Sequence, residues 1–60
     1  MRAILYGVDE NGIRVEIITK VFDRALPASQ WAQEQHDKYM RLFNGGSPIR
    51  PTSYYVVDNS

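Results

Sequence analysis

The residue types that most often carry out catalysis are few in this sequence and form no catalytic pattern. His36 is the only histidine, and there is no cysteine. Asp37 is adjacent to it in a predicted helix, so the two side chains project in different directions and form no Asp–His relay. The serines, at positions 29, 47, 53 and 60, carry no Gly-x-Ser-x-Gly signature. We therefore expect no enzyme activity, no metal site and no cofactor.

Length and charge narrow the classes of protein further. The chain has 60 residues, with seven basic and seven acidic side chains and a net charge of zero. This length predicts one domain, residues 1–60. The absence of cysteine excludes disulfides and is typical of a reducing cytoplasm, where we expect the protein to act. No apolar run approaches the roughly 18 residues of a membrane span, and the balanced charge argues against nucleic acid as a partner.

Two strand-forming segments predict a β-hairpin at the start of the chain. Residues 2–8 are rich in strand formers, and residues 13–22 alternate between apolar and polar side chains. Asn11-Gly12 between them is typical of a two-residue turn in which both positions adopt positive φ. Such a turn places Val8 opposite Val15 and Tyr6 opposite Ile17.

A helix and a third strand complete the predicted fold. Residues 27–44 form the helix, which begins at Pro27 and ends with Gly45 as a left-handed cap. Residues 52–58 form the last strand, which the right-handed crossover rule places beside the first. The sequence thus predicts an α+β fold, β-β-α-β, with a three-stranded antiparallel sheet in the order 2-1-3. The single helix covers one face of this sheet.

Hydrophobic periodicity assigns the side chains to a core and to an uncovered sheet face. The predicted core comprises Ile4, Tyr6, Val8, Val15, Ile17, Val21, Ala28, Ala32, Tyr39, Leu42 and Phe43. On the uncovered face we expect Leu5, Ile18 and Phe22, either as scattered exposed apolar residues or as a patch for a partner or a second copy. Arg14, Lys20 and Tyr55 on the same face suggest the alternative of a small nucleic-acid-binding regulator.

Trp31 allows two interpretations. It lies at the edge of the apolar helix stripe, where a tryptophan most often seals the core. Alternatively, a partly exposed ring near Gln35 acts as a binding anchor, because tryptophan is over-represented among binding hot spots. We therefore count Trp31 and Gln35 with Leu5, Ile18 and Phe22 as candidate partner-binding residues.

The order of elements and the helix residues Gln30-Trp31-Ala32, with Gln35 a turn later, resemble the Dmd antitoxin family of T-even-type phages. Members of that family are small phage proteins that neutralise host ribonuclease toxins by binding them. The resemblance implies a non-catalytic, phage-encoded inhibitor that binds a host defence or toxin enzyme in the host cytoplasm. Steric occlusion of the enzyme would be its mechanism.

Overall fold

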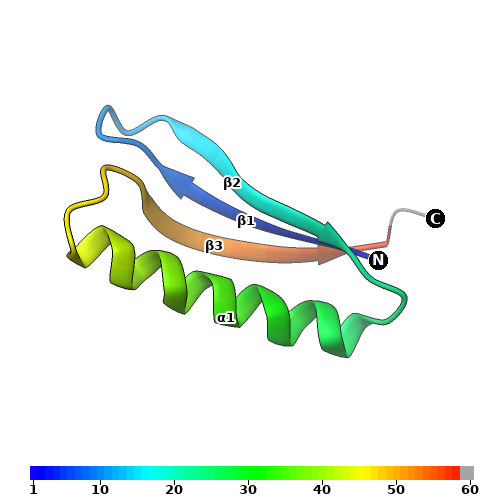
Figure 1. Cartoon of the computed structure of the whole chain (residues 1–60). Coiled ribbons are helices and arrows are strands. Elements are labelled where there is room, and N and C mark those ends of the chain that lie inside the picture. The colour runs from blue at the N-terminus through cyan, green and yellow to red at the C-terminus, as the bar shows by residue number, and fades with distance from the viewer. Residues whose placement is uncertain (59–60) are drawn as a thin grey trace.

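The computed structural model describes residues 1–58 and contains one sheet and one helix (Figure 1). The elements in chain order are β1 (Arg2–Val8), β2 (Arg14–Val21), α1 (Ala25–Asn44) and β3 (Arg50–Val57). Both β2 and β3 pair antiparallel with β1, so the strand order is β2-β1-β3. The predicted α+β class, strand order and single helix layer are confirmed.

The hairpin loop has three residues, not the predicted two. The Asp9 N–H donates to the Ile13 carbonyl at 3.0 Å, which leaves residues 10–12 as the loop. Only Gly12 in this loop has a positive φ, of 80°, whereas Asn11 does not. The Asp9 carboxylate explains the difference, because its Oδ1 accepts the N–H groups of Asn11 and Ile13, each at 2.9 Å.

Asp9→Ala is therefore expected to lower the free energy of unfolding by about 1 kcal/mol, because two turn amides lose their acceptor. Urea denaturation followed by circular dichroism measures this loss. Glu10→Ala is the control, since Glu10 is exposed in the same loop and should unfold at the wild-type midpoint. Equal midpoints for both variants would show that the carboxylate does not hold the turn.

Each edge strand contains a β-bulge, and the first one corrects the predicted register. Leu5 pairs with Ile18 as predicted, but Tyr6 pairs with Glu16 and Val8 with Arg14, so Ile17 is an extra residue in β2. The pairing of β1 with β3 shifts in the same way between Tyr6 and Gly7, with Thr52 as the extra residue. The predicted pairs Tyr6–Ile17 and Val8–Val15 are therefore wrong.

The helix packs on the opposite face of β1 from the one predicted. Ala3, Leu5 and Gly7 are buried beneath it, and Leu5 has no exposed surface. Ala3 forms the core with Ala28 and Ala32 of α1, with Phe22, Trp31, Tyr54 and Val56 packed around them. Ile4, Tyr6 and Val8 consequently lie on the uncovered face, not in the core. Two other predicted core residues are exposed, Val21 (61%) and Leu42 (49%).

Close packing within the sheet excludes a side chain at Gly7. A Cβ on Gly7 would lie 2.5 Å from the Arg50 carbonyl oxygen of β3 and 2.7 Å from Ile17 Cδ1 of β2. This position of β1 therefore requires glycine. The bulge at Ile17 lets Val15, Ile17 and Ile18 all turn toward the helix side, which regular alternation forbids.

The helix begins two residues earlier than predicted and ends at Asn44 as predicted. α1 begins at Ala25, so Pro27 lies in the first turn. The N–H that proline lacks has no helical partner there, so no helical hydrogen bond is lost. At the other end, Gly46 and not Gly45 has positive φ, of 115°. Its N–H donates to the Phe43 carbonyl and that of Ser47 to Leu42, which is a Schellman motif. No helix within residues 1–58 has the length and apolar character needed to span a bilayer.

Candidate binding face

Three of the predicted partner-binding residues do not lie on the uncovered face. Leu5 is fully buried under α1, and Ile18, its partner in β2, shares that helix side. Phe22 packs on the alanine core, with its ring centroid 5.6 Å from that of Trp31. Ile18 pairs with Leu5 as predicted, so it lies on the helix side because the helix covers the face of β1 that carries Leu5. The predicted patch of Leu5, Ile18 and Phe22 is therefore wrong as a surface.

Trp31 and Gln35 both lie on the sheet-facing side of α1 and are half-buried. Trp31 packs against Phe22 and the alanine core, which favours the interpretation that it seals the core edge. Of the residues that carry the antitoxin resemblance, Ala32 is fully buried and only Gln30 is exposed. That motif thus serves the packing of α1 on the sheet.

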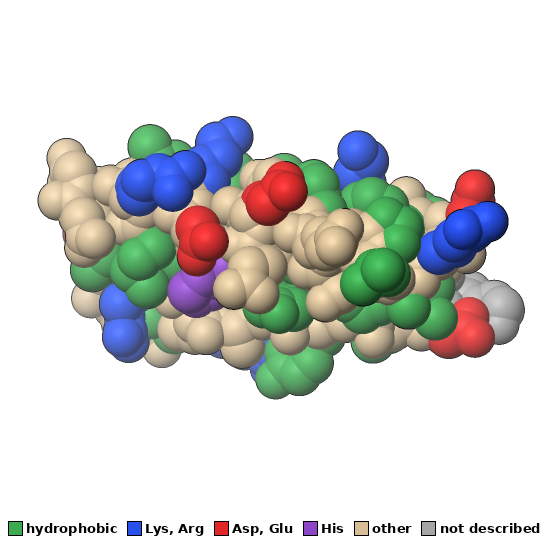
Figure 2. Space-filling view, turned by 90° about the horizontal axis from the view of Figure 1, so that it is seen from below, with side chains coloured by type: hydrophobic (Ala, Val, Ile, Leu, Met, Phe, Trp, Pro, Cys, Tyr) green, Lys and Arg blue, Asp and Glu red, His purple; other side chains and the backbone are tan. Residues whose placement is uncertain are grey.

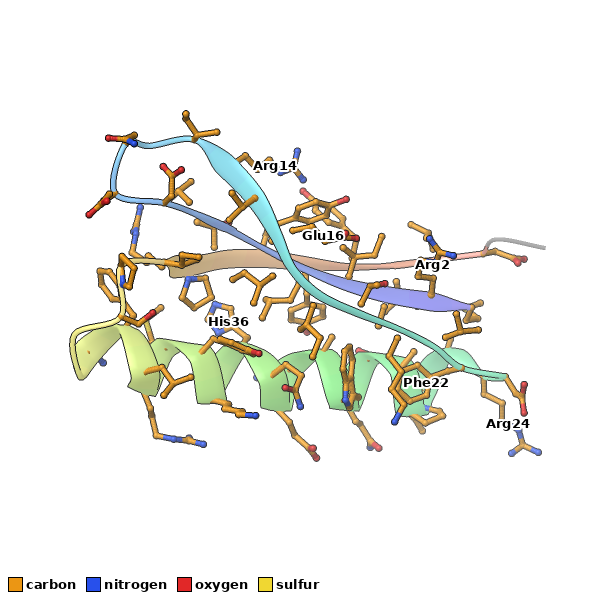
Figure 3. All side chains as sticks on the ribbon, turned by 45° about the horizontal axis from the view of Figure 1, so that its top comes forward. Arg2, Arg14, Glu16, Phe22, Arg24 and His36 are labelled. Atoms are coloured by element: carbon orange, nitrogen blue, oxygen red, sulfur yellow. The ribbon has the colours of Figure 1, made fainter. Side chains whose placement is uncertain are left out.

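The uncovered side of the sheet, here called the open face, consists of four rows that cross β2, β1 and β3. The register gives these rows as Arg14–Val8–Arg50, Glu16–Tyr6–Ser53, Thr19–Ile4–Tyr55 and Val21–Arg2–Val57. Figure 3 shows Arg2, Arg14 and Glu16 on this side, with His36 and Phe22 on the side of the helix. No described element covers the open face. Ile4, Tyr6 and Tyr55 form its centre with Glu16 beside them, and its three arginines belong to the first and last rows.

A cluster of Tyr6, Tyr55 and Arg14 forms the most ordered part of the open face. The two tyrosine rings meet edge to face, with centroids 5.7 Å apart. The Arg14 Cζ lies 4.0 Å from the Tyr6 ring centroid and 5.9 Å from that of Tyr55. Arg14 makes no ion pair with a carboxylate among residues 1–58. Its guanidinium is therefore held by the rings, and its N–H donors remain available to an incoming acceptor.

The alternative of nucleic-acid binding depends on Arg14, Lys20 and Tyr55 lying together. The structure brings Arg14 and Tyr55 together but separates Lys20 from them. Lys20 pairs with Ala3 on the helix side, and its Nζ lies 5.3 Å from the Phe22 ring centroid. The Arg14 guanidinium also covers one face of Tyr6, so this ring offers a base less surface for stacking.

The helix side of the molecule offers a weaker candidate. Acidic and basic side chains are interspersed on it (Figure 2), so no single charge prevails. A shallow pocket between α1 and β3 is lined by Gln33, His36, Thr52, Ser53 and Tyr54. The Tyr54 hydroxyl donates to Gln33 Oε1 at 3.4 Å, and His36 Nδ1 lies 3.9 Å from Asp37 Oδ1.

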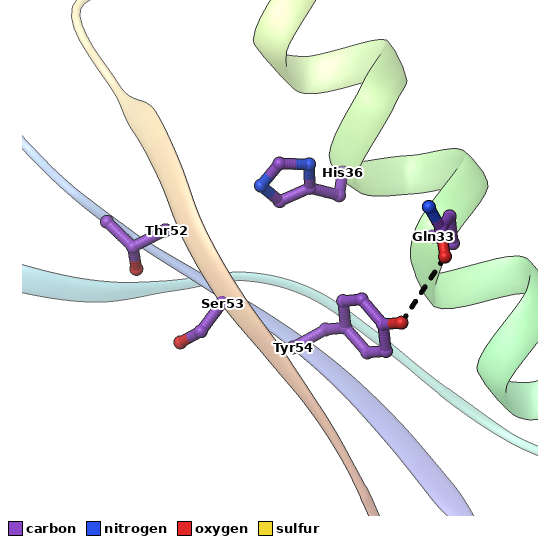
Figure 4. A pocket seen from close by; sticks show the side chains of 5 residues that line it. All are labelled: Gln33, His36, Thr52, Ser53 and Tyr54. Atoms are coloured by element: carbon purple, nitrogen blue, oxygen red, sulfur yellow. Dashed lines mark hydrogen bonds between the residues drawn. The ribbon is translucent and has the colours of Figure 1, made fainter.

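The pocket residues do not converge on a common point. The imidazole of His36 approaches β3 from the helix, whereas the Ser53 hydroxyl points away from it (Figure 4). No hydrogen bond joins the two side chains in the described structure, so they do not form a nucleophile–base pair. Residues 1–58 also contain no group of three His, Asp or Glu side chains placed to hold a metal ion.

Comparison of the chain with protein-family profiles, curated proteins and solved structures finds no match. The antitoxin resemblance remains a prediction from the sequence. The assignment of the open face as a binding surface therefore depends on its geometry alone. Ile4, Tyr6 and Val57 belong to it although the sequence analysis did not select them as binding residues. The alternation of side chains along β1 and β3 shows that these residues share a face of the sheet. The sequence does not tell which of the two faces the helix covers.

Proposed function

We propose that the chain is a non-catalytic protein-binding inhibitor whose partner docks on the open face. The observation that carries this proposal is the cluster of Tyr6, Tyr55 and Arg14 on a sheet face that no described element covers. Tyrosine and arginine are enriched among residues that dominate binding energy. In this cluster the tyrosine and arginine side chains already pack against one another, so fewer rotamers are lost on binding and the entropy cost is lower.

The chemistry of the open face favours a protein partner over a nucleic acid. The two central rows bring Tyr6, Ile4 and Tyr55 together, and Tyr55 is 48% exposed. An apolar and aromatic centre fits the desolvated core of a protein interface. Glu16 lies beside this centre, so the three arginines of the face, Arg2, Arg14 and Arg50, do not form a continuous basic surface for a phosphate backbone. A partner that suits the face supplies an apolar surface and a carboxylate for Arg14.

Steric occlusion is the mechanism that a face of this size and composition supports. A bound sheet face covers part of an enzyme's surface without contributing reactive groups. The resemblance to Dmd-type antitoxins supports a host defence or toxin enzyme as the target, in the cytoplasm of an infected bacterium. The packing role of Trp31 and Ala32 is compatible with this, since the helix then supports the sheet that binds.

Tyr55→Ala is expected to weaken partner binding by about 2 kcal/mol or more, which is about thirtyfold, while the protein stays folded. Tyr55 stands on an edge strand, away from the helix, so its loss leaves the alanine core intact. The measurement is affinity capture from a bacterial lysate by immobilised protein, with mass spectrometry and circular dichroism of each variant.

Leu26→Ala is the matched control, because Leu26 is also apolar and exposed (68%) but lies at the start of the helix. It should capture the partner as wild type does. Equal capture by the Tyr55 variant would refute the open face as the docking surface. Capture of nucleic acid alone, with affinity that falls steeply as salt rises, would support the regulator hypothesis instead.

A further inference from the structure

Charge is divided unequally between the open face and the rest of the molecule. The rows of the open face contain three of the seven basic side chains, Arg2, Arg14 and Arg50, but only one of the seven acidic ones, Glu16. The rest of the chain therefore carries four basic and six acidic side chains. A chain without net charge thus has a formal charge of +2 on the open face and of −2 elsewhere. A partner surface that complements the open face is acidic.

Arg14 is the arginine that a docked partner covers most completely. Its Cζ lies 4.0 Å from the Tyr6 ring centroid and 5.9 Å from that of Tyr55, so the guanidinium reaches from the first row over the centre of the face. The residue is exposed to water in the chain by itself. A partner that covers the two rings also covers this charge, and burial of a charge is costly unless an opposite charge pairs with it.

The carboxylates near Arg14 in this chain do not pair with it. Within residues 1–58, no ion pair joins Arg14 to an Asp or a Glu. Glu16 stands in the next row of the same strand, beside Tyr6. The Asp9 carboxylate is used by the hairpin loop, where its Oδ1 accepts the N–H groups of Asn11 and Ile13. The acceptor that Arg14 needs on burial therefore has to come from the partner.

A carboxylate is the acceptor that suits this guanidinium. It accepts two N–H groups of an arginine at once, and such a charged pair is stronger than a neutral hydrogen bond. The tyrosine rings already hold the Arg14 side chain, so less rotamer entropy is lost when the pair forms. A neutral acceptor would satisfy the N–H groups but would leave the positive charge buried without compensation.

The arginines lie at both ends of an apolar centre, which sets the length of the complementary segment. The first row has an arginine on each side of Val8, and the fourth row has Arg2 between two valines. Val8 and Arg2 are the two ends of β1, and six residues of extended strand span about 20 Å. Ile4 and Tyr6 lie between them. A matching segment carries carboxylates toward both of its ends and apolar side chains at its middle.

We infer that the protein partner binds the open face through an acidic segment of this kind, with one of its carboxylates paired to the Arg14 guanidinium. The inference rests on the proposed function, because it names the chemistry of the partner that docks there. A nucleic acid would supply charge for the arginines, but it has no apolar side chains to cover Ile4 and Tyr6.

Selection from a library of random displayed peptides tests this chemistry without knowledge of the partner. Fourteen residues are long enough, because even a helix of that length spans about 20 Å. Peptides that bind wild type but not Tyr55→Ala are expected to carry Asp or Glu toward both ends and apolar residues between them. Binders of this class without Asp or Glu would overturn the acidic segment and leave the open face as the docking surface. If every binder were indifferent to Tyr55→Ala, the proposed function itself would fail.

The best recovered peptide then tests the role of Arg14 by isothermal titration calorimetry. Replacing its Asp and Glu by Asn and Gln should weaken binding at least about tenfold, and so should Arg14→Gln in the protein. Arg14→Lys should recover only part of this loss, because lysine keeps the charge but not the two-pronged donor. Glu16→Gln should bind the peptide at least as tightly as wild type, since it removes a like charge.

Arg41→Gln is the matched control, because Arg41 is also exposed but lies on the helix. It should bind the peptide as wild type does, and circular dichroism of all variants should match wild type. Wild-type affinity in Arg14→Gln would overturn the pairing of Arg14 with a carboxylate. Tighter binding of a 14-nucleotide oligothymidylate than of the peptide would overturn the acidic protein segment in favour of nucleic acid.

Discussion

Leu5→Ala is expected to lower the free energy of unfolding by about 2–5 kcal/mol and to leave much of the protein unfolded at 37 °C. Among residues 1–58, Leu5 is the only large side chain with no exposed surface, so truncation opens a cavity that its small neighbours cannot fill. A domain of this size has a total stability of about 5 kcal/mol. Urea and thermal unfolding, followed by circular dichroism, measure the loss.

Ile4→Ala is the matched control for this experiment. Ile4 is adjacent to Leu5 and similar in volume, but it lies half-buried on the open face. Its truncation should lower the free energy of unfolding by less than half as much as that of Leu5. If Ile4→Ala were the more damaging change, the helix would cover the other face of the sheet, as the alternating pattern alone predicted.

Gly7→Ala should also destabilise the fold severely, by about 3 kcal/mol. The added Cβ would lie 2.5 Å from the Arg50 carbonyl oxygen, which belongs to the backbone of the neighbouring strand. A flexible side chain such as Ile17 can move, but the backbone of a paired strand cannot move without loss of pairing between β1 and β3. Amide hydrogen exchange in β3 and urea unfolding both report this change.

Gly45→Ala serves as the control for the glycine substitution. A Cβ at Gly45 would have its nearest neighbours at 3.5 Å, an ordinary contact, and its φ of −86° suits any residue. This variant should be as stable as wild type or more stable by about 0.4–1 kcal/mol, because alanine restricts the unfolded chain. Comparable losses at both glycines would mean that Gly7 is not limited by contact with β3.

The sequence predicts the elements of this fold well because each has a local signal. Strand formers and alternation define the hairpin, and the apolar stripe with the Gly45-Gly46 stop defines the helix. The strand order follows from the crossover rule, which depends on chirality and not on particular side chains. These features are all confirmed.

The faces of the sheet could not be predicted from alternation, because a bulge changes its phase within β2. Before Ile17, the even-numbered residues of β2 lie on the open face; after it, the odd-numbered ones do. Simple alternation places Val15 and Ile18 on opposite sides, and the bulge brings both to the helix side. The close approach of Arg50 to Gly7 depends on contacts between distant segments, which no local pattern contains.

The binding residues expected from the sequence differ from those of the open face because the two faces of β1 were exchanged. Leu5, Ile18 and Phe22 were assigned to the surface because the opposite face of β1 was assigned to the core. Tyr55 and Arg14 were recognised together, since both were assigned to the uncovered side. The packing of Arg14 on Tyr6 was not foreseen, because the predicted register placed Tyr6 in the core.

The position of β1 between β2 and β3 also affects how the protein folds during synthesis. β2 follows β1 directly, whereas β3 begins only at Arg50, after the whole helix has been made. A growing chain thus exposes an isolated hairpin, which is at best marginally stable, until its last strand leaves the ribosome. During that interval both faces of the hairpin are bare. The sheet is therefore expected to form only after β3 has been made, when Arg50–Val57 returns to pair with β1.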